Sequence, residues 1–431
     1  MHCDVLIVGG GPAGSTAAAL LAERGYRVTL LEKAHHPRFH IGESLLPANL
    51  PLFERLGVAE QVRAIGMRKE GAEFVSPDHE QAQTFAFSEA WDKSMTFAYQ
   101  VRRSQLDEIL IRNAANKGAE VLEGCRARRV DFPENRGDPV SVHAETDTGE
   151  MQLWQTRFVI DASGRDTLLG TQFKVKKRNP LHNSSALYGH FEGARRNPGQ
   201  AEGNISIFWF EHGWFWFIPL AGGVTSIGAV TWPHYMKTRG QRSPEQFFLD
   251  TVASCPKLTE RLSEARLVSE VHATGNYSYV CDRTHGERYL LLGDAYAFID
   301  PVFSSGVMLA MHSAFAGAEA VSTSLSRPEL SKQALERFDR VMRRGPRIFS
   351  WFIYRVSSPA MRELLMHPRN MFRVKEALLS VLAGDIFGNT PIWGSVFAFK
   401  CIYYLSFVVH WKSSFAAWRM RRNNIQPVEL H

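Results

Sequence analysis

The sequence has few cysteines and no paired cysteine motif. Five cysteines are scattered over 431 residues, and none belongs to a Cys-x-x-Cys pair. Zinc sites and disulfide frameworks need closely spaced or paired cysteines, so this distribution argues against both and predicts reduced thiols in a cytoplasmic protein. Residues 4–8 already resemble a core strand, which argues against a signal peptide at the N-terminus.

The chain also lacks a strong charge imbalance. Its net charge is +6, and no run of Lys and Arg with interleaved aromatic residues is present. Nucleic-acid binding is therefore not predicted. There is no internal repeat or low-complexity segment, and 45% hydrophobic residues over this length suit a globular protein of two or three domains.

The first thirty-odd residues carry the pattern of a dinucleotide-binding βαβ unit. An apolar strand over 4–8 precedes a glycine-rich turn, a helix over 15–24 and a strand over 26–31. The Gly-x-Gly-x-x-Gly spacing allows a tight bend, close approach of a pyrophosphate and close helix–strand packing. The helix N-terminus attracts phosphate, and an acid after the second strand can bind ribose hydroxyls. The pattern predicts a site for an ADP-containing dinucleotide at Gly9, Gly11, Pro12, Ala13, Gly14 and Glu32.

Three histidines follow this unit, at His35, His36 and His40. No further ligand cluster accompanies them, so we interpret the segment as a loop over the cofactor and predict no metal site. Beyond it, the pattern predicts helices over 45–56, 103–117 and 307–324. Antiparallel strands are predicted over 126–142, 145–153 and 156–160, and a mostly antiparallel, aromatic-rich sheet over 174–232.

Three separated segments together resemble the FAD-dependent aromatic hydroxylases and their relatives. They are the glycine turn with Glu32, the turn Asp161-Ala162-Ser163-Gly164, and Gly293-Asp294. The resemblance implies that Glu32 holds the adenosine ribose, that Arg103 contacts the pyrophosphate and that Asp294 meets the ribityl chain. It places Asp161 and Gly164 near the FAD.

The resemblance implies an α/β fold with three units. A discontinuous Rossmann-type FAD-binding domain takes residues 1–66, 101–172 and 280–327. An antiparallel substrate domain takes 67–100 and 173–279, and a helical C-terminal region takes 328–431.

Further motifs are similar to those of flavin-dependent halogenases. Residues 213–219 match the signature Trp-x-Trp-x-Ile-Pro, residues 68–74 resemble the segment with the essential lysine, and 42–44 and 301–306 also look like halogenase sequence. In that family, reduced FAD and O2 oxidise halide to hypohalous acid, which a lysine hydrogen-bonds or converts to a haloamine. The resemblance implies Lys69 as that lysine and Ser305 and Gly306 as the halide site, with Gly306 also against the FAD. It places Trp214, Trp216, Pro219 and Phe303 along the substrate path.

One departure from the family narrows the expected substrate. Tryptophan halogenases have a glutamate three residues before the halide-site glycine, and this chain has Phe303 there. The resemblance is therefore closer to halogenases of phenols and of pyrroles tethered to carrier proteins. The alternatives are an aromatic hydroxylase, a prenyl-chain reductase and a non-catalytic flavin-binding partner. No second Gly-x-Gly-x-x-Gly is present, so reduced FAD is expected from a separate flavin reductase.

Residues 392–422 are largely apolar and end in a basic, Trp-containing stretch. Lys400 near the middle makes a membrane span costly. We expect a buried helix with a solvated basic tail, and keep open contact with an anionic membrane surface, a helix that caps the substrate channel, or a span.

Overall fold

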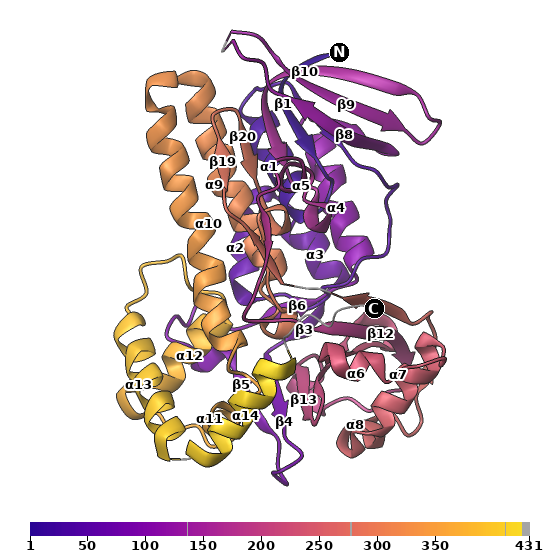
Figure 1. Cartoon of the computed structure of the whole chain (residues 1–431), viewed down its shortest axis with the longest axis vertical. Coiled ribbons are helices and arrows are strands. Elements are labelled where there is room, and N and C mark those ends of the chain that lie inside the picture. Colours follow the sequence, from indigo (N-terminus) through magenta and orange to yellow (C-terminus); the bar gives the residue numbers. More distant parts are fainter. Residues whose placement is uncertain (136, 276–277, 410, 425–431) are drawn as a thin grey trace.

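The computed structural model describes residues 1–135, 137–275, 278–409 and 411–424. Figure 1 shows one β-sheet at the top and a second below it. Helices α9 (Gly306–Ser326) and α10 (Ser331–Ile353) run along one side, and the C-terminal helices lie beside the lower sheet.

The upper sheet is the expected dinucleotide-binding sheet. Its strands follow the order β19-β20-β10-β1-β2-β7, and β20, β10, β1, β2 and β7 are parallel, while β8 and β9 extend it by antiparallel pairing. Strand β1 is central in this sheet, between β10 and β2, and its apolar residues Leu6 and Ile7 are fully buried. The strands are β1 (His2–Val8), β2 (Val28–Leu31), β7 (Glu120–Leu122), β8 (Cys125–Asp131), β9 (Val140–Thr146), β10 (Met151–Asp161), β19 (His285–Gly286) and β20 (Tyr289–Leu291).

Helices α1 (Pro12–Glu23), α4 (Arg103–Asn116) and α9 pack together against this sheet. The predicted helix over 45–56 begins later than expected, because a 3-10 turn at Pro47–Asn49 precedes α2 (Leu50–Leu56). It ends at Gly57, whose left-handed backbone is typical of a glycine after a helix. Helices α3 (Ala59–Ile65) and α5 (Leu168–Gln172) complete this part.

The prediction of separate antiparallel strands over 145–153 and 156–160 is wrong. Strand β10 is continuous across Trp154 and Gln155, because no turn-forming residue interrupts it. Its first half pairs antiparallel with β9, and its second half pairs parallel with β1 and β20. This switch brings Asp161, at the end of β10, beside the end of β1.

The lower sheet is the predicted aromatic-rich sheet. It follows the order β16-β12-β15-β14-β13-β4-β5, with β17 on β12, and its pairs are antiparallel except for β13 on β4. Phe215 and Phe217 face one side and Trp214 and Trp216 the other, because side chains alternate along a strand. The strands are β4 (Gly71–Val75), β5 (Gln83–Ala86), β12 (Ser185–Glu192), β13 (Ile205–Phe210), β14 (Gly213–Pro219), β15 (Val224–Thr231), β16 (Arg266–Leu267) and β17 (His272–Gly275).

Two small sheets connect the larger ones. Strand β3 (Met67–Lys69) pairs with β6 (Ala98–Gln100), and β11 (Lys176–Arg178), β18 (Tyr279–Cys281) and β21 (Ala297–Phe298) form the other. Helices α6 (Pro233–Lys237), α7 (Pro244–Ala253) and α8 (Pro256–Arg261) lie beside the lower sheet (Figure 1). The boundaries of the three units stay a prediction.

The C-terminal region is helical, with α11 (Pro359–Met366), α12 (Val374–Leu382), α13 (Trp393–Val409) and α14 (Trp411–Asn424). We expected a buried helix here, and this expectation is wrong for one face of α13. Val396, Phe399 and Tyr403 are buried, but Phe397 is 69% exposed and Leu405 is 67% exposed. Among the described helices, none is long and apolar enough to cross a membrane.

Candidate functional site

A cavity of about 990 Å³ lies where the parallel strands of the upper sheet end. Its walls come from the turns after β1, β10 and β20, from the first turn of α9, and from β14 of the lower sheet. Ligands of α/β sheets bind at this carboxyl edge, because the loops there are free to diverge. Segments far apart in the sequence thus meet around one space.

The three glycines of the turn after β1 have different surroundings. Gly9 has a φ of +102°, and a Cβ on Gly14 would lie 1.8 Å from the Gly9 carbonyl oxygen, so helix α1 packs directly on the turn. Gly11 is different: a Cβ there would meet only Arg38, with Nη2 at 3.8 Å. Gly11 therefore borders open space in front of the N-terminus of α1, which fits the pyrophosphate of a dinucleotide.

Glu32 is buried at the end of β2 and faces this turn. Its Oε2 accepts a hydrogen bond of 2.6 Å from the Gly10 N–H, and its Oε1 accepts one of 2.9 Å from Ala34. Arg38 lies between two acids, with Nε 3.9 Å from Glu32 Oε1 and Nη1 3.3 Å from Asp107 Oδ2. Arg38 is the cation at the open side of Gly11, and the sequence patterns did not single it out.

Arg103, at the start of α4, is buried in the cavity wall. It forms a bidentate ion pair with Asp107, at 2.9 and 3.0 Å, and Nη1 donates to the Ile41 carbonyl oxygen at 2.9 Å. Gly42, with a φ of +107°, allows this approach, because a Cβ there would lie 2.9 Å from Nη1. Arg103 thus holds the 41–42 loop over the cavity.

In the turn after β10, one predicted residue lines the cavity and another lies behind the cavity wall. Gly164 lines the cavity, whereas Asp161 lies behind it: its Oδ1 accepts from the Ser163 N–H at 3.0 Å and its Oδ2 from the Leu169 N–H at 2.7 Å. Burial raises the pKa of Asp161. The carboxyl group of Asp161 therefore shapes the turn from behind and does not reach the cavity itself.

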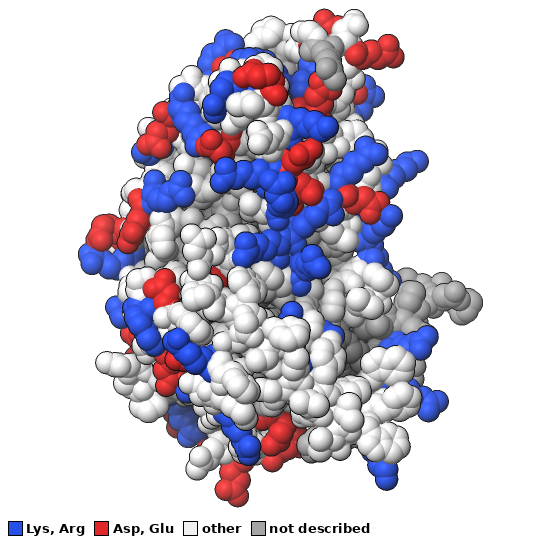
Figure 2. Space-filling view, turned by 90° about the vertical axis from the view of Figure 1, so that its left-hand side faces the viewer, with Lys and Arg blue, Asp and Glu red and all other residues white. Residues whose placement is uncertain are grey.

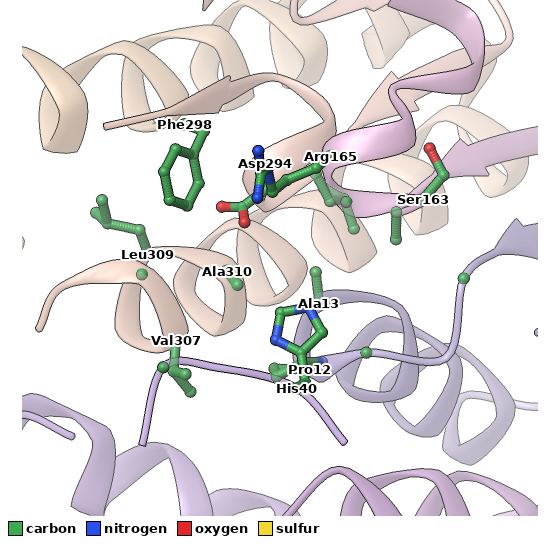
Figure 3. Close-up of a pocket in the computed structure, with 18 of the residues that line it drawn as sticks. Pro12, Ala13, His40, Ser163, Arg165, Asp294, Phe298, Val307, Leu309 and Ala310 are labelled. Atoms are coloured by element: carbon green, nitrogen blue, oxygen red, sulfur yellow. The ribbon is translucent and has the colours of Figure 1, made fainter. Parts of the chain in front are cut away.

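Asp294 lies in the cavity wall, in the turn after β20. Burial raises its pKa to about 6, and the positive charges of Arg103 and Arg165 oppose that shift. Figure 3 shows Asp294 and Arg165 on the same side of the pocket, above Ala13 and Pro12 of α1. Arg165 is held by Thr274 and Gly275 of the lower sheet, so it joins the two sheets at this point.

The predicted halide residues stand at the N-terminus of α9. Ser305 is the N-cap residue and is buried, and a Cβ on Gly306 would meet nothing within 4 Å, so the first turn of a 21-residue helix opens into the cavity. Ser304, at a φ of +56°, makes the bend before it. Such a helix end attracts anions. Phe303 is buried and does not line the cavity. The centroid of its ring lies 6.3 Å from the centroid of the Phe352 ring.

Lys69 is the last residue of β3 and is 1% exposed. Its Nζ donates to Ser44 Oγ and to the Leu45 carbonyl oxygen, both at 3.0 Å, and Ser44 lines the cavity. Among the described residues no acid forms an ion pair with Lys69. Burial therefore lowers the pKa of Lys69 to about 7. A buried lysine without a partner acid is costly, and such groups concentrate at functional sites.

Two tryptophans form the lower wall of the cavity. Trp214 and Trp216 lie 6.2 Å apart between ring centroids, and Trp216 donates to Ser226 Oγ at 3.2 Å. Gly228 on β15 makes room for the second indole, because a Cβ there would lie 2.1 Å from its ring. Pro219, at the end of the same strand, does not line the cavity.

A further pair, of buried Glu43 and partly buried His190, lies at the cavity wall and was not predicted as part of the site. His190 Nε2 lies 3.1 Å from both carboxylate oxygens of Glu43, and Glu43 and Tyr188 line the cavity. Glu43 belongs to the 42–44 segment that resembles halogenase sequence, but nothing near His190 indicated its partner, because Glu43 lies in the loop after β2 and His190 lies on β12 of the other sheet.

The three histidines of the 35–40 segment do not converge on one point. His35 pairs with Asp147, His36 with Glu123, and His40 lines the cavity. Within the described residues, a separate group with metal-ligand spacing is formed by His79, Glu363 and His367, outside this cavity.

The chain was compared with known families and proteins. A family described as "FAD binding domain" matches residues 2–334. A tryptophan 2-halogenase of Chondromyces crocatus is 37% identical over 342 residues, which cover 78% of this chain and 64% of that protein. The chain thus spans less than two-thirds of that relative's length.

Two further relatives match over nearly their full lengths. A 1H-pyrrole-2-carbonyl-[peptidyl-carrier protein] chlorinase of Pseudomonas fluorescens is 30% identical over 417 residues, 90% of each protein. The structure of the myxobacterial chondrochloren halogenase aligns with a TM-score of 0.78 and 33% identity, and covers 91% of this chain and 92% of that one.

Proposed function

Because the chain belongs to the flavin-dependent halogenases, we propose that it halogenates an electron-rich aromatic ring, phenolic or pyrrolic, with Lys69 as the catalytic residue. The single observation that carries this proposal is the Lys69 amine, buried without an acid and hydrogen-bonded to Ser44 in the cavity wall. When bound and reduced, FAD supplies with O2 the oxidising power that converts halide to an electrophilic halogen.

The residues around the cavity fit FAD. The N-terminus of α1 and the open side of Gly11 receive the pyrophosphate, with Arg38 as its counter-charge, and Glu32 binds the adenosine ribose. Arg103 holds the 41–42 loop over the site, and Asp294, in the cavity wall, would meet the ribityl chain. The first N–H groups of α9, at Ser305 and Gly306, hold the halide.

Lys69 then controls the electrophilic halogen on the substrate side. The Lys69 amine donates hydrogen bonds to Ser44 Oγ and to the Leu45 carbonyl oxygen. These two bonds fix the orientation of the amine's remaining hydrogen-bonding position. Trp214 and Trp216 form the wall toward the lower sheet and would separate the substrate from the flavin. Phe303 replaces the glutamate that would accept a ring proton, so the substrate ring must be activated by its own hydroxyl or ring nitrogen.

The proposal is tested by product mass spectrometry. FAD-loaded protein, a separate flavin reductase, NADH, O2 and bromide are incubated with a panel of phenols and pyrroles. We expect a product with the isotope pair of bromine, absent without bromide. An oxygenated product that forms equally with and without bromide would instead identify an aromatic hydroxylase.

The pH dependence of halogenation should report the ionisation of Lys69. Because burial lowers its pKa to about 7, the amine loses its proton as the pH rises through that value. Desolvated lysines act as nucleophiles in the neutral form, so we expect the rate to rise between pH 6 and 8 with a midpoint near 7. The measurement is the initial rate of halogenation at each pH. As a correction for the pH dependence of the reagent itself, the rate at which added hypobromous acid halogenates the same ring is measured without enzyme. A rate that falls over this interval would assign the catalytic role to the ammonium form, as a hydrogen-bond donor.

The 392–422 segment is proposed to contact an anionic membrane surface. Helices α13 and α14 contain no Asp or Glu, and they expose Phe397, Leu405, Val408 and Trp411 together with basic residues. Figure 2 shows a broad, largely uncharged surface over the lower half of this side of the molecule. Exposed apolar and aromatic residues with neighbouring Lys and Arg are typical of helices that lie in the membrane interface.

Liposome flotation measures this contact. We expect the protein to float with anionic liposomes at low salt and Leu405→Asp/Val408→Asp to remain at the bottom, because both side chains are 67% exposed and tolerate a charge. Leu181→Asp, an exposed leucine elsewhere, should float like the wild type. Wild-type protein that stays at the bottom at low salt would contradict the membrane contact.

A further inference from the structure

Two histidines and a glutamate meet at a point outside the active-site cavity. His79 belongs to the loop between β4 and β5, which lies at the lower end of the molecule (Figure 1). Glu363 is on α11 and His367 follows that helix directly, and their spacing of four residues puts both side chains on one face. One ligand atom from each of the three residues lies within 4.8 Å of the other two. The sequence did not predict this group, because its members come from remote parts of the chain.

The distances within this group suit the ligands of one ion. His79 Nε2 lies 3.6 Å from Glu363 Oε2, and His367 Nε2 lies 3.7 Å from Glu363 Oε1. Both distances exceed the roughly 2.7–3.2 Å of a hydrogen bond between nitrogen and oxygen. Two ligands that are each about 2.1 Å from a tetrahedral ion lie about 3.4 Å from one another. One carboxylate oxygen therefore faces each imidazole at a separation close to that of two metal ligands.

The ring of His79 is already oriented for such a role. Its Nδ1 lies 3.0 Å from Oγ of Ser76, a fully buried residue whose Oγ also accepts a hydrogen bond of 3.2 Å from the Asp78 N–H. Because Nδ1 is engaged with Ser76, Nε2 is the nitrogen that is directed at Glu363. Histidines that bind metal ions are usually held through the other ring nitrogen in this way.

The donor atoms indicate which ion the group would bind. Two imidazole nitrogens with one carboxylate suit Zn²⁺, whereas Ca²⁺ and Mg²⁺ prefer oxygen ligands throughout. Within the described residues, Glu363 forms no ion pair with Lys or Arg, so its charge is available to a cation. The side chains of Glu363 and His367 are 52% and 62% exposed, so water can reach the fourth position of a tetrahedral ion.

We propose that His79, Glu363 and His367 bind Zn²⁺, with water as the fourth ligand, and that the ion ties the 76–82 loop to α11. Helix α11 contacts α13 and α14, so the ion connects the lower sheet to the C-terminal helices. None of the three residues lines the active-site cavity. The zinc site is therefore structural, and it does not depend on the proposed halogenation or on Lys69.

Calorimetric titration of zinc chloride into the FAD-loaded full-length protein, after removal of metal with a chelator, tests the site. We expect Glu363→Gln and His367→Gln each to weaken Zn²⁺ binding by about ten-fold or more, because even an outer hydrogen-bond partner of a metal ligand is worth about 10- to 100-fold in affinity. Both side chains are more than half exposed, so the fold should persist, which FAD absorbance and the thermal unfolding temperature check.

His143→Gln is the matched control. His143 Nε2 lies 2.9 Å from Asp131 Oδ2, but among the described residues this pair belongs to no group of three possible ligands. We expect this variant to bind Zn²⁺ like the wild type.

Amide hydrogen exchange measures the tie between the loop and the helix. Zn²⁺ should slow exchange over 76–82 and 359–367 in the wild type, and the chelator should reverse the effect, whereas Glu363→Gln should show no change. Zn²⁺ that does not bind the wild type, or that binds it no more tightly than it binds the two ligand variants, would overturn the site. Displacement of Zn²⁺ by an equal concentration of Mg²⁺ would overturn the choice of ion. Binding that is lost in the variants but leaves exchange unchanged in the wild type would overturn the structural role.

Discussion

Lys69→Met is expected to lower the rate of formation of halogenated product by about 100-fold or more, while FAD stays bound. Methionine matches the length and volume of the buried lysine but offers no amine, so the electrophilic halogen loses the group that holds it. The Lys69 side chain reaches the cavity wall only through Ser44 and does not line the cavity, so the flavin contacts remain unchanged. Peroxide release coupled to NADH oxidation should continue, and product is measured by mass spectrometry.

Lys257→Met is the matched control. Lys257 also donates to backbone carbonyl oxygens, those of Ser76 at 3.0 Å and Glu80 at 3.2 Å, but it lies outside the cavity. We expect this variant to halogenate like the wild type. Undiminished product from a folded Lys69→Met protein would remove Lys69 from the chemistry. Loss of FAD from that variant would show that Lys69 supports the cofactor site instead.

Gly11→Val is expected to weaken FAD binding by about 100-fold or more without unfolding the protein, because the valine side chain would occupy the space that a pyrophosphate must approach. Gly11 has a φ of −76°, which valine adopts, and a Cβ there would meet only Arg38 at 3.8 Å. FAD absorbance after gel filtration measures the loss, and the thermal unfolding temperature of the apoprotein measures the fold.

Substitutions at two other glycines serve as controls for this result. Gly394→Val, where a Cβ would meet nothing within 4 Å on the exposed start of α13, should retain FAD. Gly14→Val should unfold the protein, because its Cβ would lie 1.8 Å from the Gly9 carbonyl oxygen. Stoichiometric FAD in a folded Gly11→Val protein would contradict the assignment of this turn to the pyrophosphate.

Features with a local cause were predictable from the sequence. The βαβ unit with Glu32 follows from a buried strand, a glycine spacing and an Ala- and Leu-rich helix that are contiguous in the chain. The alternation along β14 placed Trp214 and Trp216 on one face, and the apolar run after Gly306 predicted a long helix. The same local logic failed at β10: it does not reveal that Leu153 and Thr156 belong to one strand, because the partners that extend that strand, β1 and β20, are remote.

The sequence by itself thus determined the dinucleotide turn, the order of the cofactor motifs and the residue types of the lysine and halide segments, because each depends on neighbours within a few positions. Only the tertiary structure decided what those residues face. It sets Lys69 against Ser44, Arg38 between Glu32 and Asp107, and Glu43 against His190. Burial, pKa and charge balance arise from contacts between distant segments, and no periodicity within one segment encodes them.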